Sequence, residues 1–126
     1  MRTVRDIMRK PRGSLFVTHS LADAAEQIGP DGGGVVVLNL CGQPVGVITD
    51  ALLQHWRAAY PENWRKKRCA CALPDSPGVI PGETLLEDIQ MSTFEIHHAL
   101  LVSDEEDIIG WVSAAALTQQ RQQFAA

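Results

Sequence analysis

The chain has 126 residues, of which 45% are apolar and 21% charged, and its formal net charge is −4. This length allows one compact domain or two very small ones packed together. No apolar run approaches the roughly 20 residues that cross a bilayer. The basic N-terminus lacks the apolar stretch of a secretory signal, and three cysteines, an odd number, argue against a disulfide framework. We therefore expect a cytoplasmic protein without a membrane partner.

The first half of the chain predicts a strand, a helix, two strands and a second helix. Ser20 and Asp23 have the spacing of a capping box, in which a hydroxyl and a carboxylate satisfy the first free amides of a helix. Apolar residues after them recur on one helical face, and a second helix begins at Thr49. The predicted strands are short apolar runs at 15–17, 35–38 and 44–48.

The second half repeats these elements at a fixed offset. Displacing the chain by 64 residues places Ser20 on Thr84 and residues 46–49 on 110–113 without a gap. The matched elements are a strand at 79–80, a helix capped by Thr84 and Glu87, strands at 99–102 and 108–112, and a helix from Ser113. The prediction is an α/β (α+β) protein of two β-α-β-β-α units, residues 1–62 and 63–126, with 61–78 as the connector.

Three kinds of motif stand at the spacing expected of one family. They are Val4-Arg5-Asp6-Ile7-Met8, the pair Gly46-Val47-Ile48-Thr49 and Gly110-Trp111-Val112-Ser113, and Ile96-His97-His98 before a strand. On these residues the chain resembles a stand-alone tandem pair of CBS domains, a Bateman module, over residues 3–120. The resemblance implies two pseudo-two-fold related units packed through their sheets, two clefts between them, and a homodimer formed through helices.

The same resemblance implies how a ligand would bind. In family members that bind adenosine nucleotides, the Thr or Ser of the glycine step contacts the ligand, and an aspartate three residues later holds the ribose. This chain has Leu52 and Ala116 at those positions, and neither can accept a hydrogen bond from a ribose diol. It also has Gly32-Gly33-Gly34 where the second unit has Ile96-His97-His98, which predicts a wider or more mobile cleft on the first unit.

The candidate ligand-binding residues are Thr49, Ser113, His98, Val17 and Pro81. Thr49 and Ser113 begin helices, whose positive ends attract phosphate, although a role as helix caps also explains both. His98 corresponds by resemblance to the family's histidine, and a structural role is the alternative.

No catalytic or metal site is predicted. The sequence contains neither a phosphate-binding loop nor a nucleophile elbow, so we expect no enzymatic activity. The segment Cys69-Ala70-Cys71 does not supply the four firmly spaced ligands of structural zinc.

The sequence leaves three functions open. The first is a regulatory module that senses an adenosine-type metabolite (AMP, ATP or S-adenosylmethionine) and acts on an unidentified protein. The second is a structural or protein-interaction module without a nucleotide ligand, which dimerises through helix faces such as that of Leu53, Trp56 and Tyr60. Nucleic-acid binding through the basic run at 65–68 is the third and weakest, because the net charge is acidic and aromatic residues are not interleaved with the run.

Overall fold

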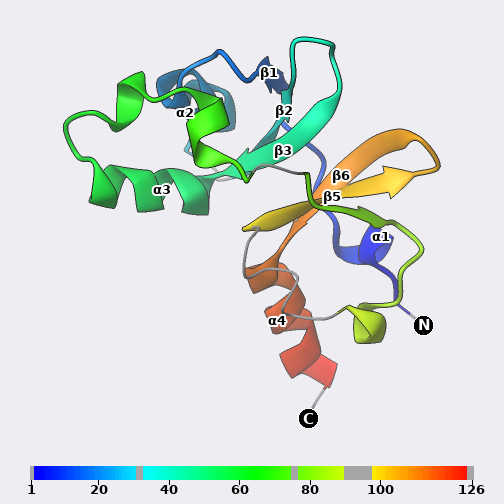
Figure 1. The fold of residues 1–126 in the computed structure, drawn as a ribbon. Coiled ribbons are helices and arrows are strands. Elements are labelled where there is room, and N and C mark those ends of the chain that lie inside the picture. Colours follow the sequence, from blue (N-terminus) through cyan, green and yellow to red (C-terminus); the bar gives the residue numbers. More distant parts are fainter. Residues whose placement is uncertain (1, 31–32, 75–76, 90–97, 125–126) are drawn as a thin grey trace.

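The computed structural model describes residues 2–30, 33–74, 77–89 and 98–124 (Figure 1). The first unit consists of β1 (Ser14–Phe16), α2 (Leu21–Ile28), β2 (Gly34–Leu38), β3 (Pro44–Thr49) and α3 (Asp50–Ala59). The second consists of β4 (Val79–Pro81), the 3-10 turn η3 (Leu86–Asp88), β5 (Ala99–Asp104), β6 (Asp107–Ser113) and α4 (Ala114–Phe124). A short helix, α1 (Val4–Ile7), precedes the first unit, and two 3-10 turns, η1 (Trp64–Lys66) and η2 (Cys69–Ala72), lie between the units.

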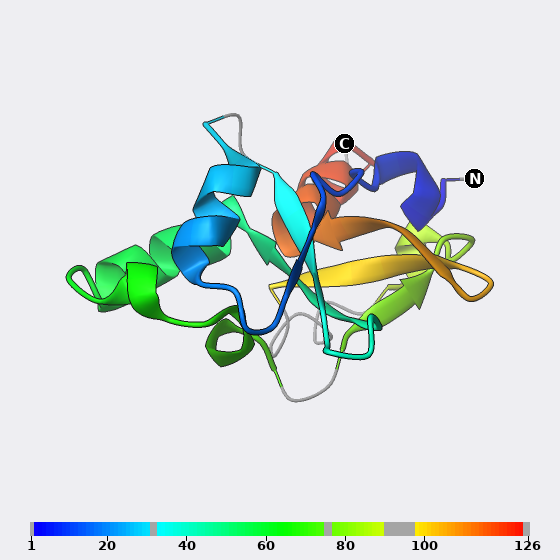
Figure 2. The same cartoon turned by 90° about the horizontal axis from the view of Figure 1, so that it is seen from above.

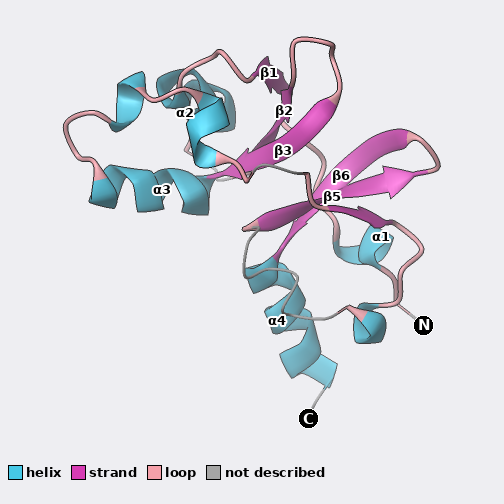
Figure 3. Cartoon of the chain, in the orientation of Figure 1, coloured by secondary structure: helices cyan, strands magenta, loops and turns pink. Residues whose placement is uncertain are grey.

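Each unit contains one three-stranded sheet, in the order β1-β2-β3 or β4-β5-β6. The first two strands of each sheet are parallel and the last two form an antiparallel hairpin. The two sheets meet at the centre of the molecule, with α2 and α3 on one side and α4 on the other (Figures 1 and 3). This arrangement confirms the predicted α/β fold of two packed units.

Three clusters of buried side chains hold the molecule together. One lies between the first sheet and helices α2 and α3, and a second joins the second sheet to α1, η3 and α4. The third fills the space between the two sheets and consists of Val36, Val47, Ala99, Leu101 and Trp111. Because the third cluster draws on both sheets, burial of apolar area fixes the units against each other.

The two units correspond at an offset of 65 residues rather than 64 in their middle strands. Val36 pairs with Val47 and Leu101 pairs with Trp111, so β2 and β5 are displaced by one residue from the predicted match. The second hairpin turn is one residue shorter than the first, which restores the offset of 64 in β6. The gapless repeat predicted from the sequence is therefore wrong by one residue over part of each unit.

The predicted cap at Thr84 and Glu87 is also wrong. The 3-10 turn η3 begins after Leu85 without a side-chain cap, and the carbonyl of Thr84 accepts a hydrogen bond from the amide of Val4 at 2.9 Å. Residues 96 and 97 of the predicted motif lie outside the described residues. In the first unit the prediction is confirmed, since the Ser20 hydroxyl accepts from the amide of Asp23.

Each unit is completed by a segment from beyond its predicted limits. Val4 is fully buried in the core of the second unit, and Arg5 pairs with Asp104 at 3.2 Å. In the same way Trp64 and Cys69 belong to the core of the first unit. Figure 2 shows α1 beside the second unit. The division at residue 62 stays a prediction, while the packing crosses it in both directions.

Candidate ligand clefts

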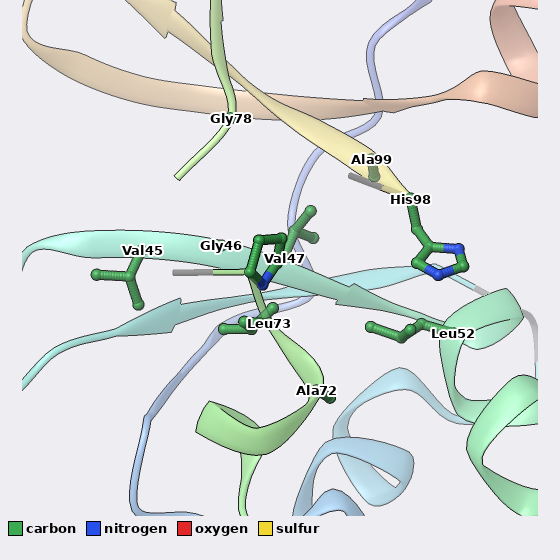
Figure 4. Close-up of a pocket in the computed structure, with 10 residues that line it drawn as sticks. Val45, Gly46, Val47, Leu52, Ala72, Leu73, Gly78, His98 and Ala99 are labelled. Atoms are coloured by element: carbon green, nitrogen blue, oxygen red, sulfur yellow. The ribbon is translucent and has the colours of Figure 1, made fainter. Parts of the chain in front are cut away.

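The first cleft lies between the units, beside Gly46 and Val47 of β3. It contains a cavity of about 20 Å³, lined by both sheets and by the connector. The lining residues include Val47, Leu52, Leu73, Pro74, Gly78, His98 and Ala99 (Figure 4). A cavity of this size holds about one water molecule. Any larger ligand must therefore displace a side chain.

Leu73 lines the first cleft from the connector and packs against the first core. A Cβ atom added at Gly46 would lie 2.8 Å from Cδ2 of Leu73, so only glycine allows the leucine to pack against β3. Leu52 is almost fully buried and forms the wall at the beginning of α3. His98 stands just before β5 and is exposed, and its ring centroid lies 6.0 Å from that of His55 on α3. The cleft therefore has apolar walls and two imidazoles at its mouth.

The second cleft is the equivalent space beside Gly110 and Trp111 of β6. Trp111 is 3% exposed, and its ring lies so close to Gly34 that an added Cβ there would be 2.6 Å from Cε2 of the indole. The guanidinium carbon of Arg9 lies over the ring, 5.3 Å from its centroid. At Gly110 an added Cβ would lie 2.9 Å from the sulfur of Met8. Indole and arginine therefore occupy the second cleft, while the thioether of Met8 packs against the core of the second unit.

The glycines of the first unit consequently leave no wider cleft. Gly34 is buried in β2, and the volume freed by its missing side chain is taken by Trp111. Gly33 is buried as well, with the Arg12 side chain 3.3 Å from the place of an added Cβ. Gly32 lies outside the described residues. The expected open space at Gly34 is absent because Trp111, in the other sheet, fills it.

Comparison with solved structures decides what these two units are. A CBS-domain-containing protein of Agrobacterium tumefaciens superposes with a TM-score of 0.67 over 94% of this chain and 92% of its own, at 16% identity. CBSX2 of Arabidopsis thaliana, crystallised with AMP, superposes with a TM-score of 0.64 over the full length of both chains at 23% identity. This chain has the fold of a tandem CBS-domain pair. The sequence itself matches no protein-family model and no curated protein.

The structure confirms Thr49 and Ser113 as helix caps in the two CBS units. Thr49 is 5% exposed, and its hydroxyl accepts from the amide of Leu52 at 3.2 Å. The hydroxyl of Ser113 accepts from the amide of Ala116 at 3.1 Å. Each hydroxyl keeps its own proton for a further acceptor, so a ligand contact remains open to both.

Of the other candidates, only His98 lines the cavity of the first cleft. Val17 packs against the first core, and its amide donates to the carbonyl of Leu38 at 2.9 Å. Pro81 is exposed at the end of β4. The equivalent of Val17 is Gly82, whose amide donates to the carbonyl of Ser103. The prediction paired Pro81 with Val17 because its offset of 64 is one residue too short in this part of the chain.

Sequence reasoning missed Leu73, Pro74 and the role of Trp111. The signal was present in the corrected repeat: Ala99 and Val47 of the first cleft correspond to Gly34 and Trp111 of the second. A smaller residue opposite a much larger one indicates a packed pair, because interiors keep a constant density.

The cysteines lie apart from both clefts. Cys69 is fully buried, and its thiol donates to the carbonyl of Ser20 at 3.6 Å. Burial, with a smaller effect of the Asp23 charge, raises the pKa of Cys69 to about 11, so it remains a thiol at neutral pH. Cys41 and Cys71 are exposed. Within the described part of the chain, no three histidine, cysteine or acidic side chains are grouped to hold a metal ion.

Part of the basic run at 65–68 is engaged with aromatic rings. Arg65 lies over Trp64, 5.3 Å from the ring centroid, and Lys67 lies over Tyr60 at 5.2 Å. Leu53, predicted to contribute to a dimerising face, is 1% exposed and belongs to the first core. Among the described residues, no helix has both the length and the apolar character needed to cross a membrane.

Proposed function

We propose that this chain is a regulatory ligand-binding module that senses an adenosine-type metabolite in the first cleft. The observation that carries the proposal is the cavity built from both CBS units, with Val47 and Leu52 on one side and His98 and Ala99 on the other. A ligand held by both units changes how they sit against each other. That is what a sensor must do, since a ligand shifts only equilibria in which its contacts differ.

The chemistry of the cleft suits a flat apolar group attached to an anion. Val47, Leu52, Leu73 and Ala99 present the apolar surface that a purine base requires. The first turn of α3 lies close by, and the amides at a helix N-terminus attract phosphate. His98 and His55 provide further donors at the mouth. CBSX2, which has the same fold, was crystallised with AMP, which supports AMP as the first ligand to test.

Leu52 determines what kind of binding to expect. It leaves the ribose hydroxyls without a carboxylate, and it keeps the wall of the cleft apolar. A ligand larger than the cavity must also displace a lining side chain such as Leu73, which costs part of its binding energy. We therefore propose weak binding that responds to millimolar changes in metabolite level, with ATP and S-adenosylmethionine as the alternatives to AMP.

The proposed mode of action is non-enzymatic. The module would act in the cytoplasm as a homodimer and pass the change in its geometry to a regulated protein. The competing function is a dimerisation or interaction module without a ligand. One observation favours it: Tyr60 is 46% exposed and stacks on Trp56 at 5.2 Å between centroids, which gives α3 an aromatic surface even though Leu53 is buried.

A thermal-shift titration with AMP, ATP and S-adenosylmethionine separates these functions. Ligand at a hundred times its Kd stabilises a fold by about 2.7 kcal/mol, which raises the Tm by several degrees at this size. The shift should shrink in His98→Ala and persist in Pro81→Ala, the matched control outside the cleft. A well-folded protein that shows no shift with any of the three would refute the sensor and favour the interaction module.

A further inference from the structure

We infer that the second cleft is closed from within by Trp111, Gly34 and the segment at 9–12, so that each chain offers a ligand one cleft only. The inference concerns an internal contact, and its consequence for stoichiometry rests on the proposed function. It assigns to Trp111 the place that a ligand occupies in an open cleft.

The first support is an exchange of sizes between equivalent positions. In the first cleft Val47 faces Ala99, and in the second Trp111 faces Gly34. In the second cleft nearly all of the side-chain volume of the pair belongs to Trp111. Its indole lies in the space that the missing side chain of Gly34 leaves free. A substitution at either position alone would leave a void or a clash. The two residues therefore act as one closing unit.

The second support is a set of backbone hydrogen bonds at the second cleft. The amide of Arg9 donates to the carbonyl of Trp111 at 2.8 Å, and the amide of Trp111 donates back at 2.9 Å. The amide of Arg12 donates to the carbonyl of Gly34, also at 2.8 Å. These bonds fasten the segment at 9–12 across both strands of the second cleft.

The connector cannot make the same bonds at the first cleft. Gly13 and Gly78 are equivalent, since their carbonyls accept from the amides of Val36 and Leu101. At this offset Arg9 corresponds to Pro74 and Arg12 to Pro77. Proline has no amide proton to donate. The first cleft is therefore bordered by a segment that cannot make the two bonds that the amides of Arg9 and Arg12 make at the second cleft.

The closed state of the second cleft does not depend on the polar end of the indole. Nε1 of Trp111 is buried and has no hydrogen-bond partner among the described residues. The ring stays buried because of its contacts with Gly34, with the Arg9 guanidinium and with the apolar cluster between the two sheets. Trp111→Phe should therefore keep the cleft closed.

Calorimetric titration with AMP tests the consequence for binding. We expect one AMP per chain in the wild type. We expect no binding in V47W/A99G, which copies the closing pair into the first cleft and should remain folded, as its thermal melt will show. Two AMP per chain in the wild type would overturn the inference, and so would unchanged binding in folded V47W/A99G.

A mutant cycle tests the closure itself without a ligand, and it decides the matter if AMP binds nowhere and the proposed function fails. Gly34→Ala should lower the Tm by about 5–10 °C in the wild type, because the new Cβ meets the indole. The same substitution in a Trp111→Val background should lower it by less than about 2 °C, because the pair then resembles Val47 and Ala99. Equal losses in both backgrounds would show that Trp111 does not close this cleft.

Discussion

The two clefts of this molecule are built from equivalent strands, yet they differ in what fills them. The first keeps a small cavity between Val47, Leu52 and His98, and the second is packed with Trp111. The difference begins with the segment that borders each cleft, because Arg9 donates to the neighbouring strand and Pro74 has no amide proton. A duplicated fold can therefore devote one copy of a site to stability and leave the other for binding.

The largest expected effect compares Trp111 with its equivalent, Val47. Trp111→Ala removes a side chain that is 3% exposed and should cost about 3–5 kcal/mol of unfolding free energy. Val47→Ala should cost roughly 1–2 kcal/mol because it removes two methyl groups. Urea denaturation of both variants measures the difference. Similar losses would contradict the claim that the second cleft is the more tightly packed one.

The next comparison concerns the two bordering segments. Arg9→Pro removes the donor to the buried carbonyl of Trp111 and should destabilise the fold by about 1–3 kcal/mol. Arg9→Ala keeps the amide and should cost about 0.5–1 kcal/mol through the lost contact with the ring. Pro74→Ala, the reverse change at the first cleft, should alter stability by under about 1 kcal/mol. If Arg9→Pro were as mild as Arg9→Ala, the backbone bonds would not hold the second cleft closed.

The helix caps should show equal effects on stability and unequal effects on binding. Thr49→Ala and Ser113→Ala each remove an acceptor for a first-turn amide and should cost about 1 kcal/mol. Only Thr49 caps the helix that borders the first cleft, so only Thr49→Ala should weaken the response to AMP beyond this loss. A comparable loss of AMP binding in Ser113→Ala would point to the second cleft instead.

The smallest expected effect concerns Cys69, which holds the place in the first unit that Val4 holds in the second. Both are fully buried, so Cys69→Val should change stability by under about 1 kcal/mol at pH 7.

The same substitution should matter at high pH. Because the pKa of the folded thiol is about 11 against 9.0 for an ordinary one, ionisation favours the unfolded chain as the pH rises from 9 towards 11. The wild type should therefore lose stability over that range, and Cys69→Val should lose less. If stability fell equally with pH in the two proteins, folding would not raise the pKa of the Cys69 thiol.

Most of the fold follows from the sequence, since the capping box at Ser20, the apolar runs and the two glycine steps each encode a local structure. The one-residue shift between the units does not, because it arises at the hairpin turn. Runs of similar apolar residues match almost as well when they are displaced by one position. The contents of the clefts follow even less readily. From the sequence alone Trp111 is an ordinary strand residue. Its role depends on contact with Gly34, which is distant in the sequence and comes close only in the folded chain.

The most direct test of the central claim is NMR mapping of AMP binding, with the Trp111 indole signal assigned by comparison with Trp111→Phe. The account predicts that AMP shifts the amide signals of Gly46, Val47 and Ala99, while the Trp111 indole and the amide of Gly110 keep their positions. Shifts of similar size around Trp111 and Gly110 would contradict it, because they would show a second cleft open to the ligand.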